Sequence, residues 1–315
     1  MMQLFICMTI LQLRIVGKLL EKKENKDSAV LFLGDLTNTK NQFFLEKYIN
    51  NKCVVCSYDL NKFKPQRPFK TFKRDQYAKD IVKILPTKNY DCVYLANVDV
   101  TLVHHILSKI AYQRIRTFDD GAFNLLNERR VTKPSLYKKL THYFQGRRLH
   151  EYDLIKNTEL HYTIFQQEKE NIEYVPFINC PQKVEQSNKV SILLGTVYAE
   201  ISNDVPALLS QLDNFITNTG IEYYIPHPRD LTNYFSNIEY INSPQSAEDI
   251  IIDLIDRGYF VEIYGFFSTT QFILSSSDAV KNYTFRFTSM DNGYERLESA
   301  LVQNAVNFIT VDISK

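Results

Sequence analysis

The sequence lacks the two commonest phosphate-binding motifs. No Gly-x-Gly-x-x-Gly follows its first strand-like run, and it contains no Gly-Lys-Ser/Thr loop. Their absence argues against NAD and ATP chemistry. Charge of one sign is also missing, because 37 Lys and Arg are balanced by 36 Asp and Glu, for a net charge of +1. No overall field draws nucleic acid to such a chain, so no nucleic-acid partner is expected.

Cysteine is scarce, with five in the chain, and most lie within apolar runs where cysteine behaves as a small buried hydrophobe. This pattern favours a reduced, cytoplasmic environment. Cys53 and Cys56 have the spacing of a zinc or redox pair, but they fall in a strand-like run and no second such pair accompanies them. We expect a structural role for both, and neither a metal site nor a cofactor.

The apolar N-terminal stretch, residues 1–16, is too short to cross a bilayer, which takes about 20 residues. It lacks a basic leader and a small-residue cleavage site, and Gln3, Gln12 and Arg14 interrupt it. We expect the chain to keep this segment as a first strand followed by a helix over about 11–23.

The chain is long enough for two domains of about 150 residues each. Strand-like runs alternate with helical patterns in the first half, where one helix is expected over 102–112. The alternation fades at 157–188 and then restarts, and its last helix is expected over 294–307. We predict an α/β fold of two Rossmann-like, doubly wound domains, 1–156 and 189–315, which face a cleft and are joined by the segment between them.

His227 ends the β-run 222–225 and stands between Pro226 and Pro228, which fix the backbone direction on both sides. A positioned imidazole can donate a proton near neutral pH, which suits the protonation of a leaving group. A structural turn histidine would give the same pattern, so the motif alone leaves both roles open.

Two pairs of acids also follow strand-like runs. Asp119 and Asp120 precede a glycine that permits a tight turn, and this would expose both carboxylates above a parallel sheet. A plain Asp-Gly turn is the alternative. Glu200 and Asp204 follow the run 190–194 and could supply a catalytic base, or could cap the next helix.

Small and hydroxyl-bearing residues follow the run 190–194 and the later run 260–264. Gly195 and Thr196 end the first, while Ser268 and Thr269 follow the second and open a helix, where hydroxyls and free amide groups can hold a phosphate. Helix capping would also explain the hydroxyls. Glu248 begins the preceding helix and could contact ribose hydroxyls or serve as a capping-box acid.

A basic stretch over 129–148 carries seven Lys and Arg and no Asp or Glu, interleaved with Tyr137, Leu140, Tyr143 and Phe144. A basic amphipathic helix of this kind can lie on an anionic membrane surface. A solvated face and a patch for an anionic substrate are the alternatives.

In combination these motifs resemble the bacterial sialyltransferases, and more closely the lipooligosaccharide and capsular polysaccharide sialyltransferases of glycosyltransferase family 52. The resemblance rests on the motifs at 118–121, 224–228 and 264–270 and on the apolar start at 4–9, and it covers most of the chain in order. The Asp-x-Asp triplet of many metal-dependent glycosyltransferases is absent.

The resemblance implies a GT-B architecture and an inverting, metal-independent transfer of sialic acid from CMP-sialic acid to a terminal galactose. The N-terminal domain would face the acceptor, and the C-terminal domain would bind the CMP-sugar. His227 would protonate the departing CMP phosphate, Ser268 and Thr269 would hold it, and Glu248 would contact the cytidine ribose. The expected CMP-binding set is completed by Gly195, Thr196 and Pro228.

The resemblance leaves the base open. Asp119 matches the first acid of an Asp-Asp-Gly motif that supplies the base in a related family, with Asp120 beside it, whereas Glu200 or Asp204 could serve instead. The enzyme would act in the cytoplasm, on the inner membrane face if its acceptor is lipid-linked, and a homodimer is compatible with the sequence. A GT-B enzyme or epimerase for another nucleotide sugar, and a non-catalytic two-lobed glycan-binding protein, are the alternative functions.

Overall fold

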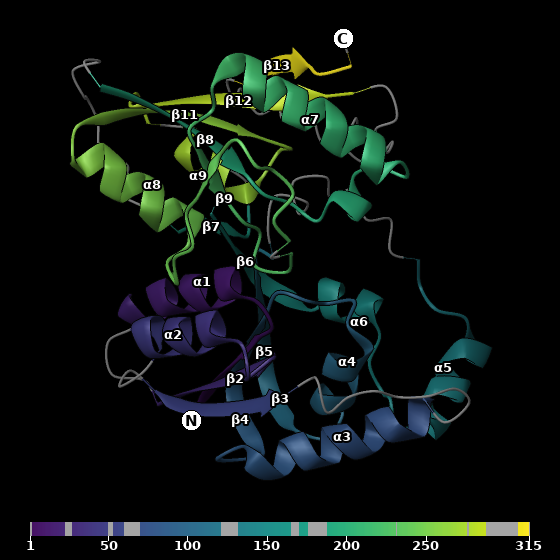
Figure 1. The fold of residues 1–315 in the computed structure, drawn as a ribbon. Coiled ribbons are helices and arrows are strands. Elements are labelled where there is room, and N and C mark those ends of the chain that lie inside the picture. Colours follow the sequence, from purple (N-terminus) through teal and green to yellow (C-terminus); the bar gives the residue numbers. More distant parts are fainter. Residues whose placement is uncertain are drawn as a thin grey trace. The chain divides into compact units, whose positions relative to one another are not determined.

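The computed structural model describes most of the chain, and its helices alternate with strands (Figure 1). The described residues are 2–22, 27–49, 53–59, 70–120, 132–164, 170–175, 188–230, 232–275, 277–287 and 308–314. They divide into two compact units. Unit 1 holds the described residues up to 175, and unit 2 holds those from 188 onward.

The sheet of unit 1 is parallel, with the strand order β3-β2-β1-β4-β5-β6-β7. Its strands are β1 (Gln3–Cys7), β2 (Ser28–Gly34), β3 (Val54–Asp59), β4 (Asn89–Leu95), β5 (Ala111–Phe118), β6 (Thr158–Thr163) and β7 (Ile172–Tyr174). Every residue of β1 and β2 is buried, as expected of parallel strands covered on both faces.

Among the helices of unit 1, polar side chains cap the starts of the first two. The helices are α1 (Ile10–Glu21), α2 (Thr39–Tyr48), α3 (Lys70–Ile84), α4 (Thr101–Leu107), α5 (Leu136–Phe144) and α6 (Glu151–Lys156). Thr9 Oγ1 accepts the Gln12 N–H at the start of α1, and Asn38 Oδ1 accepts the Lys40 N–H at the start of α2. In the packed unit, α1 lies beside α2 and α3 lies beside α4.

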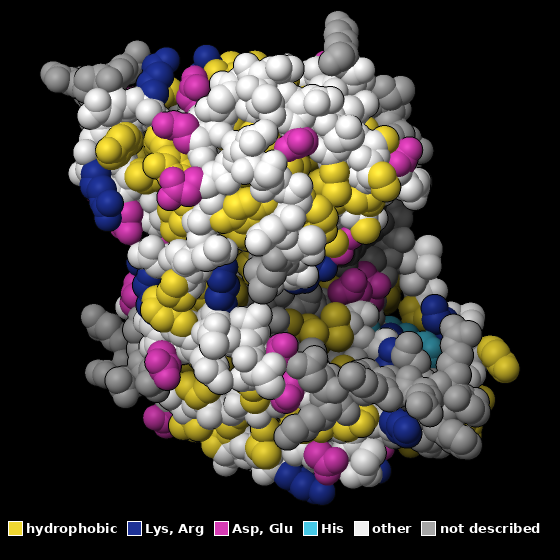
Figure 2. All heavy atoms as spheres, in the orientation of Figure 1, with side chains coloured by type: hydrophobic (Ala, Val, Ile, Leu, Met, Phe, Trp, Pro, Cys, Tyr) yellow, Lys and Arg dark blue, Asp and Glu magenta, His cyan; other side chains and the backbone are white. Residues whose placement is uncertain are grey.

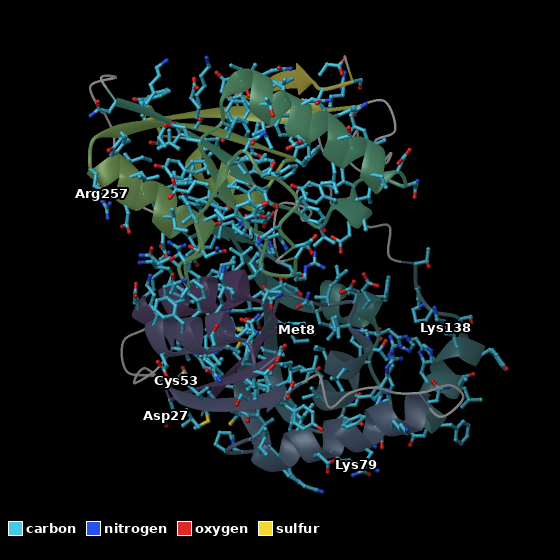
Figure 3. All side chains as sticks on the ribbon, in the orientation of Figure 1. Met8, Asp27, Cys53, Lys79, Lys138 and Arg257 are labelled. Atoms are coloured by element: carbon cyan, nitrogen blue, oxygen red, sulfur yellow. The ribbon has the colours of Figure 1, made fainter. Side chains whose placement is uncertain are left out.

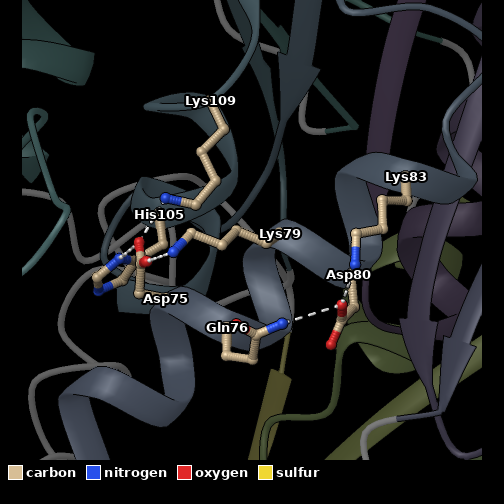
Figure 4. A network of polar contacts seen from close by, with 7 residues as sticks. All are labelled: Asp75, Gln76, Lys79, Asp80, Lys83, His105 and Lys109. Carbon is tan, nitrogen blue, oxygen red and sulfur yellow. Dashed lines mark hydrogen bonds and ion pairs between the residues drawn. The ribbon is translucent and has the colours of Figure 1, made fainter.

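A carboxylate ties α3 to α4 (Figure 4). Asp75 on α3 pairs with Lys79 at 2.9 Å and with Lys109 just beyond α4, and His105 Nδ1 lies 3.6 Å from it. Burial alone would raise the pKa of Asp75, but the hydrogen bonds from Lys109 and Lys79 lower it. The contact therefore holds a charged carboxylate between the two helices.

Unit 2 repeats this plan around a second parallel sheet, with the order β10-β9-β8-β11-β12-β13. Its strands are β8 (Asn188–Leu194), β9 (Tyr223–Ile225), β10 (Glu239–Tyr240), β11 (Tyr259–Gly265), β12 (Val280–Arg286) and β13 (Phe308–Asp312). Its helices are the 3-10 turn η3 (Tyr198–Glu200), α7 (Val205–Thr219), α8 (Ala247–Asp256) and α9 (Thr269–Leu274). Counted within each unit, the first six strands of both sheets have the order third, second, first, fourth, fifth, sixth, which is the Rossmann order, and unit 1 adds β7 as a seventh strand.

The predicted α/β architecture is confirmed, with two exceptions in unit 1. Strands β6 and β7 lie within the segment 157–188, where the sequence analysis expected only a connection. Half-buried and exposed side chains dominate both strands, so they show no apolar run. The helix expected over 102–112 ends at Leu107, because Ala111 already starts β5. The proposed domain limits stay a prediction.

Two further expectations concern helices. The helix expected over 294–307 lies outside the described residues. Among the residues that the structure does describe, none of the helices is long and apolar enough to cross a membrane.

Candidate functional site

The candidate residues of unit 2 gather at the carboxyl edge of its sheet. Parallel strands end at the same edge, so the residues after β8, β9 and β11 lie on one side. These are Gly195 and Thr196, His227 and Pro228, and Ser268 and Thr269. The chain changes direction across the sheet between β8 and β11, and this switch point is where doubly wound folds bind ligands.

Gly195 allows the ends of β8 and β9 to approach closely. Its N–H donates to the Ile225 carbonyl at 2.8 Å. A Cβ atom at this position would lie 2.7 Å from the His227 nitrogen and 2.6 Å from the Tyr224 hydroxyl oxygen, closer than real Cβ contacts. Glycine is therefore needed here to leave room for the backbone of His227.

His227 is half-buried, and a backbone N–H orients its ring. The ring Nδ1 accepts the N–H of Arg229 at 3.1 Å, so the neutral ring carries its proton on Nε2. The neighbouring Asp230 has a lowered pKa: burial opposes its ionisation, but hydrogen bonds from Tyr234 and Thr232 outweigh that effect. The hydrogen bond to Nδ1 thus sets the tautomer of the neutral His227 ring.

Glu200 and Asp204, the two candidate acids between β8 and α7, have different surroundings. Glu200 forms a two-pronged pair with Arg229, with N–O distances of 2.9 and 3.0 Å, and both side chains are more than half exposed. Asp204 is exposed and caps α7 by accepting the Ala207 N–H on Oδ1 at 3.1 Å. The cap confirms the structural alternative for Asp204 and leaves its catalytic role untested.

The hydroxyl cluster at α9 is partly used by the fold. Ser268 caps α9, since its Oγ accepts the Gln271 N–H at 3.2 Å and Gln271 Oε1 accepts the Ser268 N–H at 3.1 Å. Phe267, directly before it, has a left-handed backbone with φ of 51°, which is uncommon outside glycine. The chain therefore enters this helix through a strained residue.

Glu248 is not the capping-box acid that one reading of the sequence proposed. It stands at the second position of α8, whose cap is a bond from the Asp249 N–H to Ser246 Oγ. Glu248 Oε1 instead accepts the hydroxyl of Thr270 on α9, at 2.8 Å. This bond links the starts of α8 and α9 and places Glu248 beside the hydroxyl cluster.

An aromatic layer supports the edge of unit 2. The Tyr198 ring packs edge-on against Tyr234, Phe235 and Phe266, and its hydroxyl lies 3.3 Å from that of Tyr224. Burial strongly raises the pKa of Tyr198, so this hydroxyl stays neutral. The layer therefore packs beneath the edge of the sheet and adds no charge to it.

In unit 1 the two adjacent acids after β5 have separate roles. Asp119 is only 2% exposed and accepts three hydrogen bonds, from His161 Nε2 at 3.0 Å and from the Thr163 hydroxyl and the Ile164 N–H at 2.8 Å. These donors come from β6 and the residue after it. The carboxylate therefore joins β5 to β6, as a structural group would.

Asp120 is exposed and belongs to a polar cluster that the sequence analysis missed. The Gln12 amide donates to Asp120 and, at 2.7 Å, to Asn97 Oδ1, and the Asn97 amide donates to the other Asp120 oxygen at 2.5 Å. Gln12 Oε1 in turn accepts the N–H of Met8, the residue labelled at this edge in Figure 3. The position of Asn97 just after an apolar strand was the signal that could have suggested it.

Residues 136–144 of the basic stretch form α5, and none of the side chains of this helix is buried. Leu136, Tyr137 and Phe144 are 86%, 80% and 75% exposed. Figure 2 shows a hydrophobic side chain protruding where α5 lies, with Lys or Arg and His side chains nearby. The His142 ring, in the last turn of α5, stacks on the His150 ring at the start of α6, with their centroids 4.7 Å apart. Arg129 and Arg130 lie outside the described residues.

The thiols and acids do not assemble into a metal centre within the described part of the chain. No group of three His, Cys, Asp or Glu side chains there could hold a metal ion. Neither Cys53 nor Cys56 forms a disulfide, and Cys56 Sγ donates to the Ile84 carbonyl at 3.2 Å.

Comparison with known proteins places the chain among glycosyltransferases. The profile of glycosyltransferase family 52 matches residues 23–288. An N-acetyllactosaminide alpha-2,3-sialyltransferase of Haemophilus influenzae is 26% identical, over 89% of this chain and 90% of that protein. A CMP-N-acetylneuraminate:beta-galactoside alpha-2,3-sialyltransferase of Pasteurella multocida is 25% identical, over 98% of this chain and 99% of that protein.

Solved structures with a similar fold are also glycosyltransferases. UGT2 of Phytolacca americana, solved with UDP-2-fluoro-glucose and pterostilbene, has a TM-score of 0.53 at 8% identity, covering 98% of this chain and 85% of that one. TcCGT1, solved with UDP, has a TM-score of 0.52 at the same identity and coverage. This likeness concerns the fold alone, and it confirms the predicted α/β architecture of GT-B type.

Proposed function

Because this chain belongs to glycosyltransferase family 52, we propose that it moves sialic acid from CMP-sialic acid to a terminal galactose of a bacterial surface glycan, with inversion and without a metal ion. The family resemblance predicted from the motifs is confirmed, and the protein is a glycosyltransferase. Alpha-2,3-sialyltransferases among its relatives support the choice of sugar. A lipooligosaccharide or a capsular polysaccharide would carry the acceptor galactose.

The observation that carries the proposal is the orientation of His227. Sialic acid leaves CMP through an oxocarbenium-like transition state, and the departing phosphate gains negative charge. The Arg229 N–H donates to Nδ1 of His227, so the proton of the neutral ring lies on Nε2, the nitrogen that would donate to that phosphate. Ser268 and Thr269 would hold the phosphate, and Glu248, linked to Thr270, would contact the cytidine ribose. Gly195, Thr196 and Pro228 would line the CMP site.

We assign the base to Asp204 by comparing the surroundings of the candidate acids. Asp119 is enclosed by three donors, both oxygens of Asp120 accept amide hydrogens, and Glu200 is paired with Arg229. Asp204 is exposed, uses Oδ1 for its cap, and lies in the same unit as His227. It is therefore the acid best able to accept a proton from an acceptor hydroxyl.

Contact with the inner face of the membrane is a further part of the proposal. The exposed apolar side chains of α5 stand beside Lys138 and Lys139, a combination suited to a surface of anionic lipid. An acceptor attached to lipid would be presented at that surface. A homodimer is compatible with the proposal.

The test is CMP release from CMP-sialic acid, with and without N-acetyllactosamine and in the presence of EDTA. We expect release that depends on the acceptor and resists EDTA, and that falls roughly 100-fold or more in His227→Ala. A fall below threefold would reject the role of His227. Failure to bind CMP, together with binding of UDP, would indicate another nucleotide sugar, and failure to bind either would favour the non-catalytic glycan-binding alternative.

A further inference from the structure

The switch point of unit 1 holds a polar cluster made by three different segments. Gln12 lies in the first turn of α1, after β1, while Asn97 follows β4 and Asp120 follows β5. These strands are neighbours in the parallel sheet, so the three segments meet at its carboxyl edge. Doubly wound folds bind ligands at this place, between the first and fourth strands.

The cluster is built from a buried residue outward. The side chain of Gln12 is 0% exposed, and its amide donates to both Asn97 and Asp120. Asn97 also donates to Asp120, at 2.5 Å. Each oxygen of the exposed carboxylate therefore accepts one amide hydrogen, and the carboxylate is fixed in direction before any ligand arrives.

We propose that Asp120 and Asn97 form the binding site for hydroxyls of the acceptor's terminal sugar, with Gln12 as the positioning residue. Carboxylate oxygens have several lone pairs, so Asp120 can accept a sugar hydroxyl in addition to its amide donors. Asn97 Nδ2 has a second hydrogen besides the one given to Asp120, and a neighbouring hydroxyl can accept it. One acceptor and one donor side by side match two adjacent hydroxyls of a sugar ring.

This inference rests on the proposed function, because it takes the acceptor to be a sugar. It also explains why two adjacent acids differ. Asp119 is enclosed and joins β5 to β6, whereas Asp120 is exposed and held by amides from two other segments. The first acid supports the edge, and the second meets the ligand.

The test is calorimetric titration of the whole protein, first with CMP and then with N-acetyllactosamine at saturating CMP. Asp120→Asn should weaken N-acetyllactosamine binding roughly 10-fold or more, the usual effect of losing a hydrogen bond to a charged group. Asn97→Ala should weaken it by about threefold to tenfold. Gln76→Ala, which alters an amide on α3, is the matched control and should change neither dissociation constant.

A kinetic arm tests Gln12 as a positioning residue. Gln12→Met keeps the length of the side chain but removes its hydrogen bonds to Asn97 and Asp120, together with the one that it accepts from the Met8 N–H. We expect KM for N-acetyllactosamine to rise at least about fivefold while KM for CMP-sialic acid is unchanged. A residue with a purely structural role would change both KM values or only the thermal midpoint.

The outcomes separate this inference from the proposed function. A wild-type protein that does not bind CMP would overturn the proposed function, and the inference with it. A wild-type protein that binds CMP but not N-acetyllactosamine would overturn both the inference and the galactose acceptor of the proposed function. Asp120 and Asn97 variants that bind N-acetyllactosamine as the wild type does would overturn the inference alone.

Discussion

The two units share a strand order but differ in what they place at the carboxyl edge of the sheet. In unit 1 the edge carries amide and carboxylate side chains, Gln12, Asn97 and Asp120, that bond to one another. In unit 2 the edge carries Gly195 and His227, with backbone atoms brought into close approach. If both proposals hold, the same topology supports a hydroxyl-binding surface in one unit and a proton donor in the other.

Topology therefore supplies a location for a site, and the residues at the strand ends supply its chemistry. Histidine makes the point, because five of the six histidines in the sequence precede residue 178 and only His227 follows it. His104 and His105 are fully buried on α4, whereas His227 is half-buried at the edge of unit 2. Substitutions at buried polar residues of unit 1 should therefore change mainly stability, and substitutions at the edge of unit 2 should change mainly transfer.

The largest effect is expected from Asp204→Asn. Asparagine can keep the cap by accepting the Ala207 N–H, but it cannot act as a base. Transfer should fall about 100-fold or more, with CMP binding and stability nearly unchanged, as measured by CMP release, calorimetry and denaturation.

The corresponding change in unit 1 is the control. Asp119→Asn weakens charge-assisted bonds within a buried site, so it should lower the free energy of unfolding by roughly 1–3 kcal/mol. The opposite result would be near-normal transfer by Asp204→Asn and a large loss of transfer in a stable Asp119→Asn protein. It would show that the base is Asp119 in unit 1 and not Asp204 in unit 2.

The next effect is expected from Gly195→Ala. The added methyl group would lie 2.7 Å from the His227 nitrogen and 3.0 Å from the Ile225 carbonyl oxygen, so the backbone of His227 must shift. Stability should fall by about 1–3 kcal/mol and transfer by roughly 10-fold or more.

Gly220→Ala is the control that separates the effect of the close contact at Gly195 from the general effect of replacing a glycine. Gly220 ends α7 with φ of +67° and nothing within 4 Å of an added Cβ, so alanine there should cost about 1 kcal/mol of stability and leave the rate unchanged. Equal loss of rate in both variants would show that the close approach at Gly195 has no special role.

The sequence predicted the edge residues that directly follow apolar runs and missed those that meet only in the folded unit. His227, Gly195 and the Asp119–Asp120 pair each follow such a run, which marks the carboxyl end of a strand. Gln12 lies 85 residues from Asn97 and 108 from Asp120, and no local pattern joins them.

The separation of Asp119 from Asp120 could not be predicted for a related reason. The donors that enclose Asp119 are His161, Thr163 and the Ile164 N–H, on β6 or just after it. That strand exposes too many polar side chains to be recognised in the sequence. An unrecognised strand therefore concealed the structural role of a recognised motif.

A smaller effect is expected from pH, and it should arise in unit 1. Burial lowers the pKa of His104 to about 4 and also lowers that of His105, with Arg147 acting in the same direction. A folded pKa below the unfolded value of about 6.5 means that this stability is complete above pH 6.5 and is lost as the pH falls toward 4. The free energy of unfolding should drop by up to about 1.4 kcal/mol per pH unit for each such histidine.

Denaturation between pH 7 and pH 4.5 measures this slope. His104→Gln cannot take up the proton, so its slope should be shallower than that of the wild type. An unchanged slope would show that His104 does not control the acid sensitivity and would weaken the contrast between buried and half-buried histidines.

The smallest effect on stability is expected on the surface of α5. Leu136→Ala or Phe144→Ala should change the free energy of unfolding by less than about 0.5 kcal/mol, because both side chains are largely exposed. The control is Leu154→Ala, at a fully buried position on α6, which should lower the free energy of unfolding by about 2–5 kcal/mol. The α5 variants should instead reduce sedimentation with vesicles of anionic lipid. If they destabilise the protein as Leu154→Ala does, the apolar face of α5 is covered in the folded protein, and unchanged sedimentation would remove the support for membrane contact.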